Sequence, residues 1–140
     1  MVKFITGKIG EGKTKELIDM ANKSVRTTDG HLVFIDNTRR YIYDLHYDIR
    51  FIDTEGFPIS DYKELFGFIC GILSQDSDIS DIFIDGLARI VTDISNENLL
   101  NFVKKLEIIS KNHEVNFIIS LSCDAKSLPN EIKVLMAHDL

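Results

Sequence analysis

The chain has 140 residues, which is enough for one domain with a sizeable hydrophobic core and too few for two ordinary domains. Its hydrophobic share of 44% and charged share of 27% are typical of a soluble globular protein, and no apolar run approaches the roughly 20 residues of a membrane span. The net charge of −6 argues against a broad nucleic-acid-binding surface, so we expect neither nucleic acid nor a membrane as a partner.

The N-terminus and the cysteines bear on localisation. Residues 1–6 are too short for the apolar core of a secretory signal and lead straight into a glycine-rich loop, so we interpret them as part of the fold. Cys70 and Cys123 lie far apart and lack the paired spacing of a zinc site, which favours reduced thiols. We therefore expect a cytoplasmic protein with one domain, residues 1–140.

Apolar runs alternate with helical patterns along the chain. Buried strands are predicted at residues 2–6, 32–36, 82–85 and 116–121, with a weaker one at 48–52. Helices are predicted from the glycine-rich loop to about Val25, after Pro58 with Ser60 as N-cap, at about 95–112, and at 128–135. This alternation indicates right-handed crossovers, and hence an α/β fold with three layers, α/β/α, around a mainly parallel sheet. Ligands bind such sheets at the carboxyl ends of the strands.

The stretch GKIGEGKT, from Gly7 to Thr14, fits the pattern G-x-x-x-x-G-K-[ST] at every fixed position. It follows a predicted strand and opens a predicted helix, where glycines let backbone N–H groups turn toward phosphates at the positive end of the helix dipole. The alternative is a glycine-rich turn without a ligand, and the four fixed positions in this context make it the weaker interpretation. The residues assigned to nucleotide binding are Gly7, Lys8, Ile9, Gly10, Glu11, Gly12, Lys13, Thr14 and Lys15.

Two side chains of this loop have specific chemical roles. Lys13 supplies a mobile positive charge for the β and γ phosphates, which is a catalytic role, and Thr14 offers a hydroxyl to Mg²⁺. We therefore expect a nucleoside triphosphate as ligand, with ATP and Mg²⁺ as the cofactors.

A second element is the apolar strand DIFID, which ends in Asp85. A Walker B element holds the Mg²⁺ shell with such a carboxylate, so we assign Asp85 a catalytic and metal-binding role beside Thr14. The plainer interpretation is a turn or capping residue.

A third element is the predicted strand that ends near Ser120 and Ser122. Their hydroxyls could sense the γ-phosphate or the attacking water, with Ser122 as first choice and Ser120 as second. Small polar residues that satisfy backbone groups at a strand end are an equally good interpretation.

In this order the three elements resemble the core of the RecA-like (ASCE) branch of P-loop NTPases, over residues 1–124. The resemblance rests on the loop and on three stretches: LVFID at 32–36, DIFIDGLARI at 81–90 and NFIISLS at 116–122. They resemble the second core strand, the Walker B strand with the helical segment after it, and the sensor strand. The resemblance implies that the sensor strand lies between the P-loop and Walker B strands.

Relatives that hydrolyse ATP place a glutamate to polarise the attacking water, either just past the second strand or directly after the Walker B aspartate. In this chain Thr38 and Gly86 stand at those positions, so we expect slow hydrolysis or none. Asp36 is the catalytic candidate for orienting the water, although its shorter side chain must approach more closely.

The segment after the second strand, residues 39–43, offers tyrosines to stack on adenine and arginines to meet phosphate. Partial core for the tyrosines and a solvated face for the arginines are the alternative interpretation. Arg89 or Arg39 could act on a neighbouring protomer as an arginine finger.

Three functions fit these observations. The leading hypothesis is an ATP-binding protein, at most a slow ATPase, that acts as a nucleotide-dependent switch toward another protein or a second copy of itself. The second is a nucleoside or small-molecule kinase, because GKTKELI at 12–18 is also similar to the loop and helix of thymidine kinases. The third is an interaction module that keeps the nucleotide for stability alone.

Overall fold

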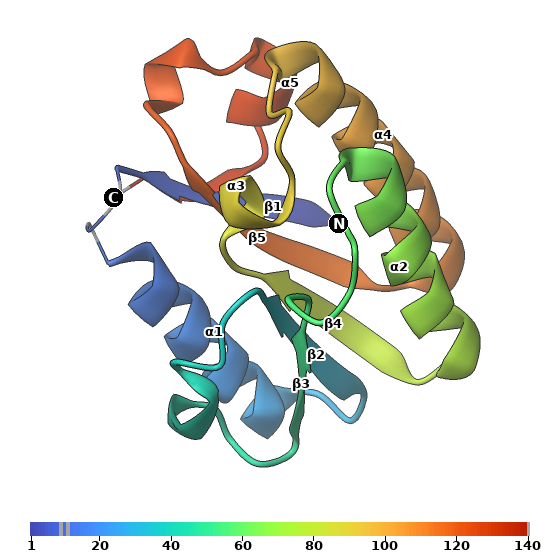
Figure 1. Ribbon diagram of the computed structural model, residues 1–140. Helices are drawn as coiled ribbons and strands as arrows, with labels where there is room; N and C mark the ends of the chain where they lie inside the picture. The colour runs from blue at the N-terminus through green and yellow to red at the C-terminus, as the bar shows by residue number, and fades with distance from the viewer. Residues whose placement is uncertain (9, 11, 140) are drawn as a thin grey trace.

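The computed structural model describes residues 1–8, 10 and 12–139, which form an α/β fold around one sheet (Figure 1). In this part of the chain six strands follow the order β3-β2-β4-β5-β1-β6, and every pairing between neighbours is parallel. The strands are β1 (Val2–Gly7), β2 (His31–Asp36), β3 (Ile49–Asp53), β4 (Ile79–Ile84), β5 (Asn116–Ser122) and β6 (Met136–Asp139). The predicted α/β class and mainly parallel sheet are confirmed.

Helices cover both faces of this sheet. α1 lies on one face, and α2 and α4 pack against each other on the opposite face (Figure 1). The helices are α1 (Lys13–Thr27), α2 (Tyr62–Gln75), α3 (Leu87–Ile90), α4 (Asn96–His113) and α5 (Asn130–Lys133), with single 3-10 turns η1 (Ile42–Asp44) and η2 (Ala125–Ser127). The arrangement has the three layers expected from the sequence.

The two faces of the sheet bury separate apolar clusters. Along β2, Val33 and Ile35 belong to the cluster under α2 and α4, whereas Leu32 and Phe34 belong to the cluster under α1. A strand covered on both faces has no polar side to show, which is why β2 and its neighbours are continuous apolar runs in the sequence. No helix of the described residues is long and apolar enough to cross a membrane.

The start of α2 corrects one prediction. Asp61, and not Ser60, is the N-cap, because its carboxylate accepts a hydrogen bond of 2.8 Å from the backbone N–H of Glu64. Glu64 in turn accepts hydrogen bonds from the backbone and the hydroxyl of Ser60, at 3.0 and 2.7 Å. Ser60 therefore supports the cap from one residue outside, since the carboxylate beside it takes the capping position.

The C-terminal region differs from its prediction. The helix expected at residues 128–135 is limited to the four residues of α5, and β6 follows it. The backbone N–H of Phe4 donates to the carbonyl of Leu135 at 2.9 Å, which brings this segment to the free edge of β1. The sequence of β6, Met-Ala-His-Asp, has neither the β-branched residues nor the alternation of a strand, so only the unpaired edge of β1 explains it.

The central strand order matches the one that the resemblance implies. β5 lies between β1 and β4, and its pairings bring Ser122 beside Gly7 and Ile119 beside Ile84. The carboxyl ends of β1, β4 and β5 consequently meet at one edge of the sheet, next to the start of α1.

Candidate functional site

A pocket of about 940 Å³ opens at this edge, between the start of α1 and the ends of β4 and β5. Residues from four regions distant in sequence line it. They are Gly10, Gly12, Lys13, Thr14, Lys15, Ile18, Asp19, Asn22, Arg40, Tyr41, Asp44, Asp85, Gly86, Leu87, Ala88, Arg89, Ser120 and Ser122. Most of the predicted site residues thus share one cavity.

The glycine-rich loop enters α1 through a conformation that requires glycine. Gly10 and Gly12 have φ angles of 87° and 84°, which L side chains rarely adopt, and Gly12 is the left-handed N-cap of α1. Gly12 has no side chain with which to cap the helix, and no side chain of the N-cap therefore satisfies the first-turn N–H groups of α1. Ile9 and Glu11, both predicted to bind nucleotide, lie outside the described residues.

The two charged side chains that flank this helix start differ in environment. Lys13 is buried, with 7% of its surface exposed, and its Nζ donates a hydrogen bond of 2.8 Å to the carbonyl of Lys8. This hydrogen bond turns the Lys13 side chain back toward the backbone of Lys8, and Lys13 lines the pocket. Lys15 points out to solvent at the pocket rim, whereas Gly7 and Lys8 are not among the described residues that line the pocket.

Asp85 follows directly after β4 and is held by two hydroxyls. The hydroxyl of Thr14 donates to its Oδ2 at 2.9 Å, and the hydroxyl of Ser120 donates to its Oδ1 at 2.5 Å. Asp85 is 2% exposed, and the N–H of Gly86 donates to the Ser120 hydroxyl at 3.3 Å. Both serines line the pocket, and Ser120 in addition holds the carboxylate of Asp85.

Arg89 joins this site to Asp36 at the end of β2. Its Nη2 lies 3.2 Å from Oδ1 of Asp36 and 3.8 Å from Oδ2 of Asp85, and its Nε donates to Oδ1 of Asn37 at 2.9 Å. Sequence reasoning had considered Arg89 only as a finger toward another protomer. The signal in the sequence is the spacing, since Arg89 lies four residues after Asp85, close enough for the single turn of α3 to bring its side chain back to that carboxylate.

Asp36 is the most perturbed carboxyl group of the site. Its pKa is raised from 3.8 to about 6, chiefly by burial and also by the charge of Asp85, while the N–H of Asn37 and Arg89 oppose the rise. Its Oδ2 is buried and has no hydrogen-bond partner among the described residues. Asp36 is not one of the described residues lining the pocket, and Arg89 stands between the two.

The donor set suits a hard divalent cation. Mg²⁺ prefers oxygen ligands, usually one or two carboxylates together with substrate phosphates and water. The hydroxyl of Thr14 and Oδ2 of Asp85 lie 2.9 Å apart, and both residues line the pocket. These two residues could hold the cation on the protein side.

The far end of the pocket is formed by α1 and the segment after β2. The guanidinium of Arg40 lies over the ring of Tyr41, 5.3 Å from its centroid, and Asp19 and Asp44 also line the pocket. Asn22 fixes this end, because its side chain bonds the carbonyl of Asp44 and the N–H of His46. Sequence reasoning had singled out Tyr41 and Arg40 but not the three residues of α1 and η1.

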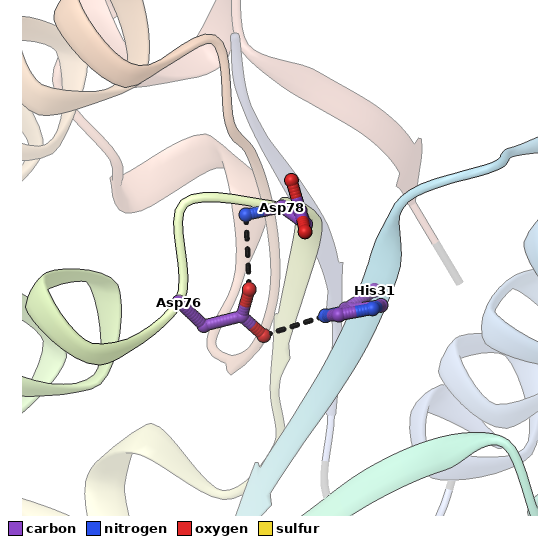
Figure 2. Close-up of side chains that lie close together, drawn as sticks. All are labelled: His31, Asp76 and Asp78. Atoms are coloured by element: carbon purple, nitrogen blue, oxygen red, sulfur yellow. Dashed lines mark hydrogen bonds and ion pairs between the residues drawn. The ribbon is translucent and has the colours of Figure 1, made fainter.

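A second polar cluster lies at the opposite edge of the sheet, where His31, Asp76 and Asp78 converge (Figure 2). Nδ1 of His31 is 2.6 Å from Oδ2 of Asp76, and the N–H of Asp78 donates to Oδ1. Arg50 lies 3.2 Å from the same Oδ2, and the pKa of Asp76 is lowered chiefly by the His31 hydrogen bond. Because a guanidinium already neutralises this carboxylate, the cluster is an ion-pair network that joins β2, β3 and the end of α2.

In comparisons with known proteins, no protein-family model and no curated protein matches the sequence. The chain is thus an α/β protein with a parallel sheet and a pocket at the carboxyl ends of its strands.

Proposed function

We propose that this chain binds ATP with Mg²⁺ in the pocket beside α1, as a P-loop NTPase of the RecA-like branch. The observation that carries the proposal is the hydrogen bond of 2.9 Å between Thr14 and Asp85, which are 71 residues apart. A motif match alone could be accidental. Its last residue, however, contacts the one strand-end carboxylate that the same hypothesis requires for metal binding.

The chain's own residues divide the work of binding. The N–H groups at the start of α1 and the Lys13 ammonium would neutralise the phosphates. Thr14 and Asp85 would hold Mg²⁺, which would balance the negative charge of the phosphates. Ser120 holds the Asp85 carboxylate in place through its hydrogen bond of 2.5 Å. Tyr41, at the far end of the pocket, offers a ring for the base.

Slow turnover follows from the residues near the proposed γ-phosphate position. The described residues that line the pocket include no glutamate, and their carboxylates are Asp19, Asp44 and Asp85. Asp85 already accepts hydrogen bonds from two hydroxyls. Asp19 and Asp44 lie at the end of the pocket that we propose for the nucleobase. Asp36 stands behind Arg89, where it can position the arginine more readily than it can reach a water molecule. A site that binds nucleotide well and hydrolyses it slowly suits a nucleotide-dependent switch that acts on another protein or on a second copy of this chain.

We propose that this switch works in the cytoplasm.

Calorimetric titration with ATP, ADP and GTP, each with and without Mg²⁺, tests the proposal. The wild-type chain should bind ATP in a Mg²⁺-dependent manner, and Lys13→Ala should lose at least roughly tenfold in affinity, since hydrogen bonds between charged groups contribute about 1.5–3 kcal/mol. Lys23→Ala is the matched control, because Lys23 lies on the same helix, exposed, and does not line the pocket. Equal ATP affinity in Lys13→Ala and the wild type would overturn the proposal.

Phosphate release on the same samples separates a switch from an ATPase. We expect release to be slow compared with nucleotide binding and dissociation. Rapid turnover by the isolated chain would contradict the switch and leave ATP binding intact.

A further inference from the structure

We propose that Arg89 is the residue that distinguishes a nucleoside triphosphate from a diphosphate in this pocket, by leaving Asp36 for the terminal phosphate. The inference rests on the proposed function and concerns its regulation. It assigns to Arg89 a role within its own chain, and it makes the short helix α3 the part of the fold that responds to the nucleotide.

Arg89 makes several polar contacts although about half of its side chain is exposed to solvent. Its guanidinium reaches Asp36, Asp85 and Asn37 at 3.2, 3.8 and 2.9 Å, yet its side chain is 52% exposed. The side chains of both aspartates are almost fully buried, so the cation is the mobile partner. Breaking the contact needs only a rotation of the arginine side chain.

The position of Gly86 shows that the fold reserves space for this guanidinium. A Cβ placed on Gly86 would lie 2.3 Å from Nη2 and 2.6 Å from Cζ of Arg89. Gly86 also has a φ angle of 70°, which favours glycine. The residue directly after the strand-end aspartate is thus the smallest possible, and the arginine packs over its backbone.

Charge explains why a triphosphate would draw Arg89 away. Mg²⁺ at Thr14 and Asp85 would compete with the guanidinium for the same Oδ2 of Asp85, since both are cations. The third phosphate of ATP, the γ-phosphate, offers Arg89 a bidentate partner that ADP lacks. The displaced arginine therefore gains a strong ligand only when the third phosphate is present.

The backbone of α3 provides a path from Arg89 to the surface. The N–H groups of Arg89 and Ile90 both bond the carbonyl of Gly86, at 2.8 and 3.1 Å. Two residues further on, the N–H and hydroxyl of Thr92 bond the carbonyl of Ser60 at the start of α2. A shift of Arg89 is expected to loosen this turn and its link to Ser60, which gives the nucleotide an effect outside the pocket.

Arg89→Ala, compared with Arg40→Ala, tests the inference by titration of ATP and ADP with Mg²⁺. Arg89→Ala should weaken ATP by roughly 10- to 100-fold and leave ADP within about threefold of the wild type. Arg40 lines the same pocket at its other end, so Arg40→Ala should change both affinities by the same factor. An equal change for ATP and ADP in Arg89→Ala, or no change, would overturn the inference.

A wild-type chain that binds neither nucleotide would overturn the proposed function itself, which distinguishes the two failures. Thermal unfolding checks that each variant is folded. Arg89→Lys keeps a cation beside Asp36 and loses the forked geometry, so it should show a smaller loss of ATP selectivity even if Arg89→Ala does not fold.

Hydrogen exchange supplies a readout independent of turnover. A non-hydrolysable ATP analogue, and not ADP, should change the exchange of the Arg89, Ile90 and Thr92 amides in the wild type, and Arg89→Lys should diminish that difference. If both nucleotides change the exchange of these amides equally, Arg89 does not read the third phosphate.

Discussion

The hydroxyl of Thr14 and the carboxylate of Asp85 meet at 2.9 Å, although one opens α1 and the other follows β4. The parallel sheet makes this meeting possible, because β5 lies between β1 and β4 and all three strands end at the same edge. A metal ion bound here would contact both side chains, so a change at either residue should alter the Mg²⁺ dependence of ATP binding.

Thr14→Val removes the hydroxyl and keeps the shape of the side chain. We expect the Mg²⁺ dependence of ATP affinity to be largely lost, with affinity in the absence of Mg²⁺ almost unchanged, because the hydroxyl is the proposed ligand from α1. Titration with and without Mg²⁺ measures this. Thr14→Ser, which keeps the hydroxyl, should retain the dependence, and the idea is wrong if Ser and Val variants behave alike.

Gly86→Ala should destabilise the fold. The φ angle of 70° is unfavourable for alanine, and the new Cβ, 2.3 Å from Nη2 of Arg89, would push the guanidinium away from its carboxylates, so we expect a loss of about 1–3 kcal/mol in the free energy of unfolding. Gly67→Ala is the matched control: Gly67 lies within α2 with nothing within 4 Å of a new Cβ, and this change should stabilise by up to about 1 kcal/mol.

Urea unfolding of both variants measures these effects. The contact with Arg89 can be isolated by combining Gly86→Ala with Arg89→Ala, since the clash disappears and only the backbone strain remains. An unchanged cost in the double variant would show that the guanidinium does not fill the space over Gly86.

Local signals explain how much of this fold could be predicted from the sequence. Four buried strands, the fifth weaker one and three of the helices were found because a strand covered on both faces or a helix with one apolar face leaves a pattern within about ten residues. The positive φ angles of Gly10 and Gly12 agree with the glycine-dependent turn that the motif predicts at the start of α1. β6 was missed because its four residues carry no pattern and pair with β1 only through the tertiary fold.

Contacts between distant residues explain what could not be predicted in the site. Arg89 and Asp36 are 53 residues apart, and nothing near either residue points to the other. The raised pKa of Asp36 likewise depends on burial and on Asp85, which belongs to another strand end. The sequence indicated which edge of the sheet bears the site, whereas the pairing of its charges required the structure.

Asp61→Ala tests the corrected cap of α2. The carboxylate accepts from the Glu64 N–H at 2.8 Å, so its removal should cost about 1 kcal/mol in the free energy of unfolding. Ser60→Ala loses only a hydroxyl contact with the exposed Glu64 side chain and should cost less. Chemical denaturation of the two variants measures the order of the effects, and a larger loss for Ser60→Ala would restore Ser60 as the cap.

Asp36→Asn should change how stability depends on pH. Burial and the charge of Asp85 raise the pKa of Asp36 from 3.8 to about 6, so the folded chain binds this proton more tightly than the unfolded chain does. The carboxyl therefore imposes no penalty below about pH 4 and its full penalty, roughly 3 kcal/mol, above about pH 6. Asparagine cannot ionise and carries no such penalty.

The free energy of unfolding of the wild type, minus that of Asp36→Asn, should consequently fall as pH rises from 4 to 7. Urea unfolding of both chains at half-unit steps of pH measures this difference, and the other titrating groups largely cancel because the two chains share them. Since Arg89 opposes the rise in pKa, the same comparison in an Arg89→Ala background should give a steeper fall. If this difference in the free energy of unfolding does not change with pH, or increases with pH, the pKa of Asp36 is not raised in the folded chain.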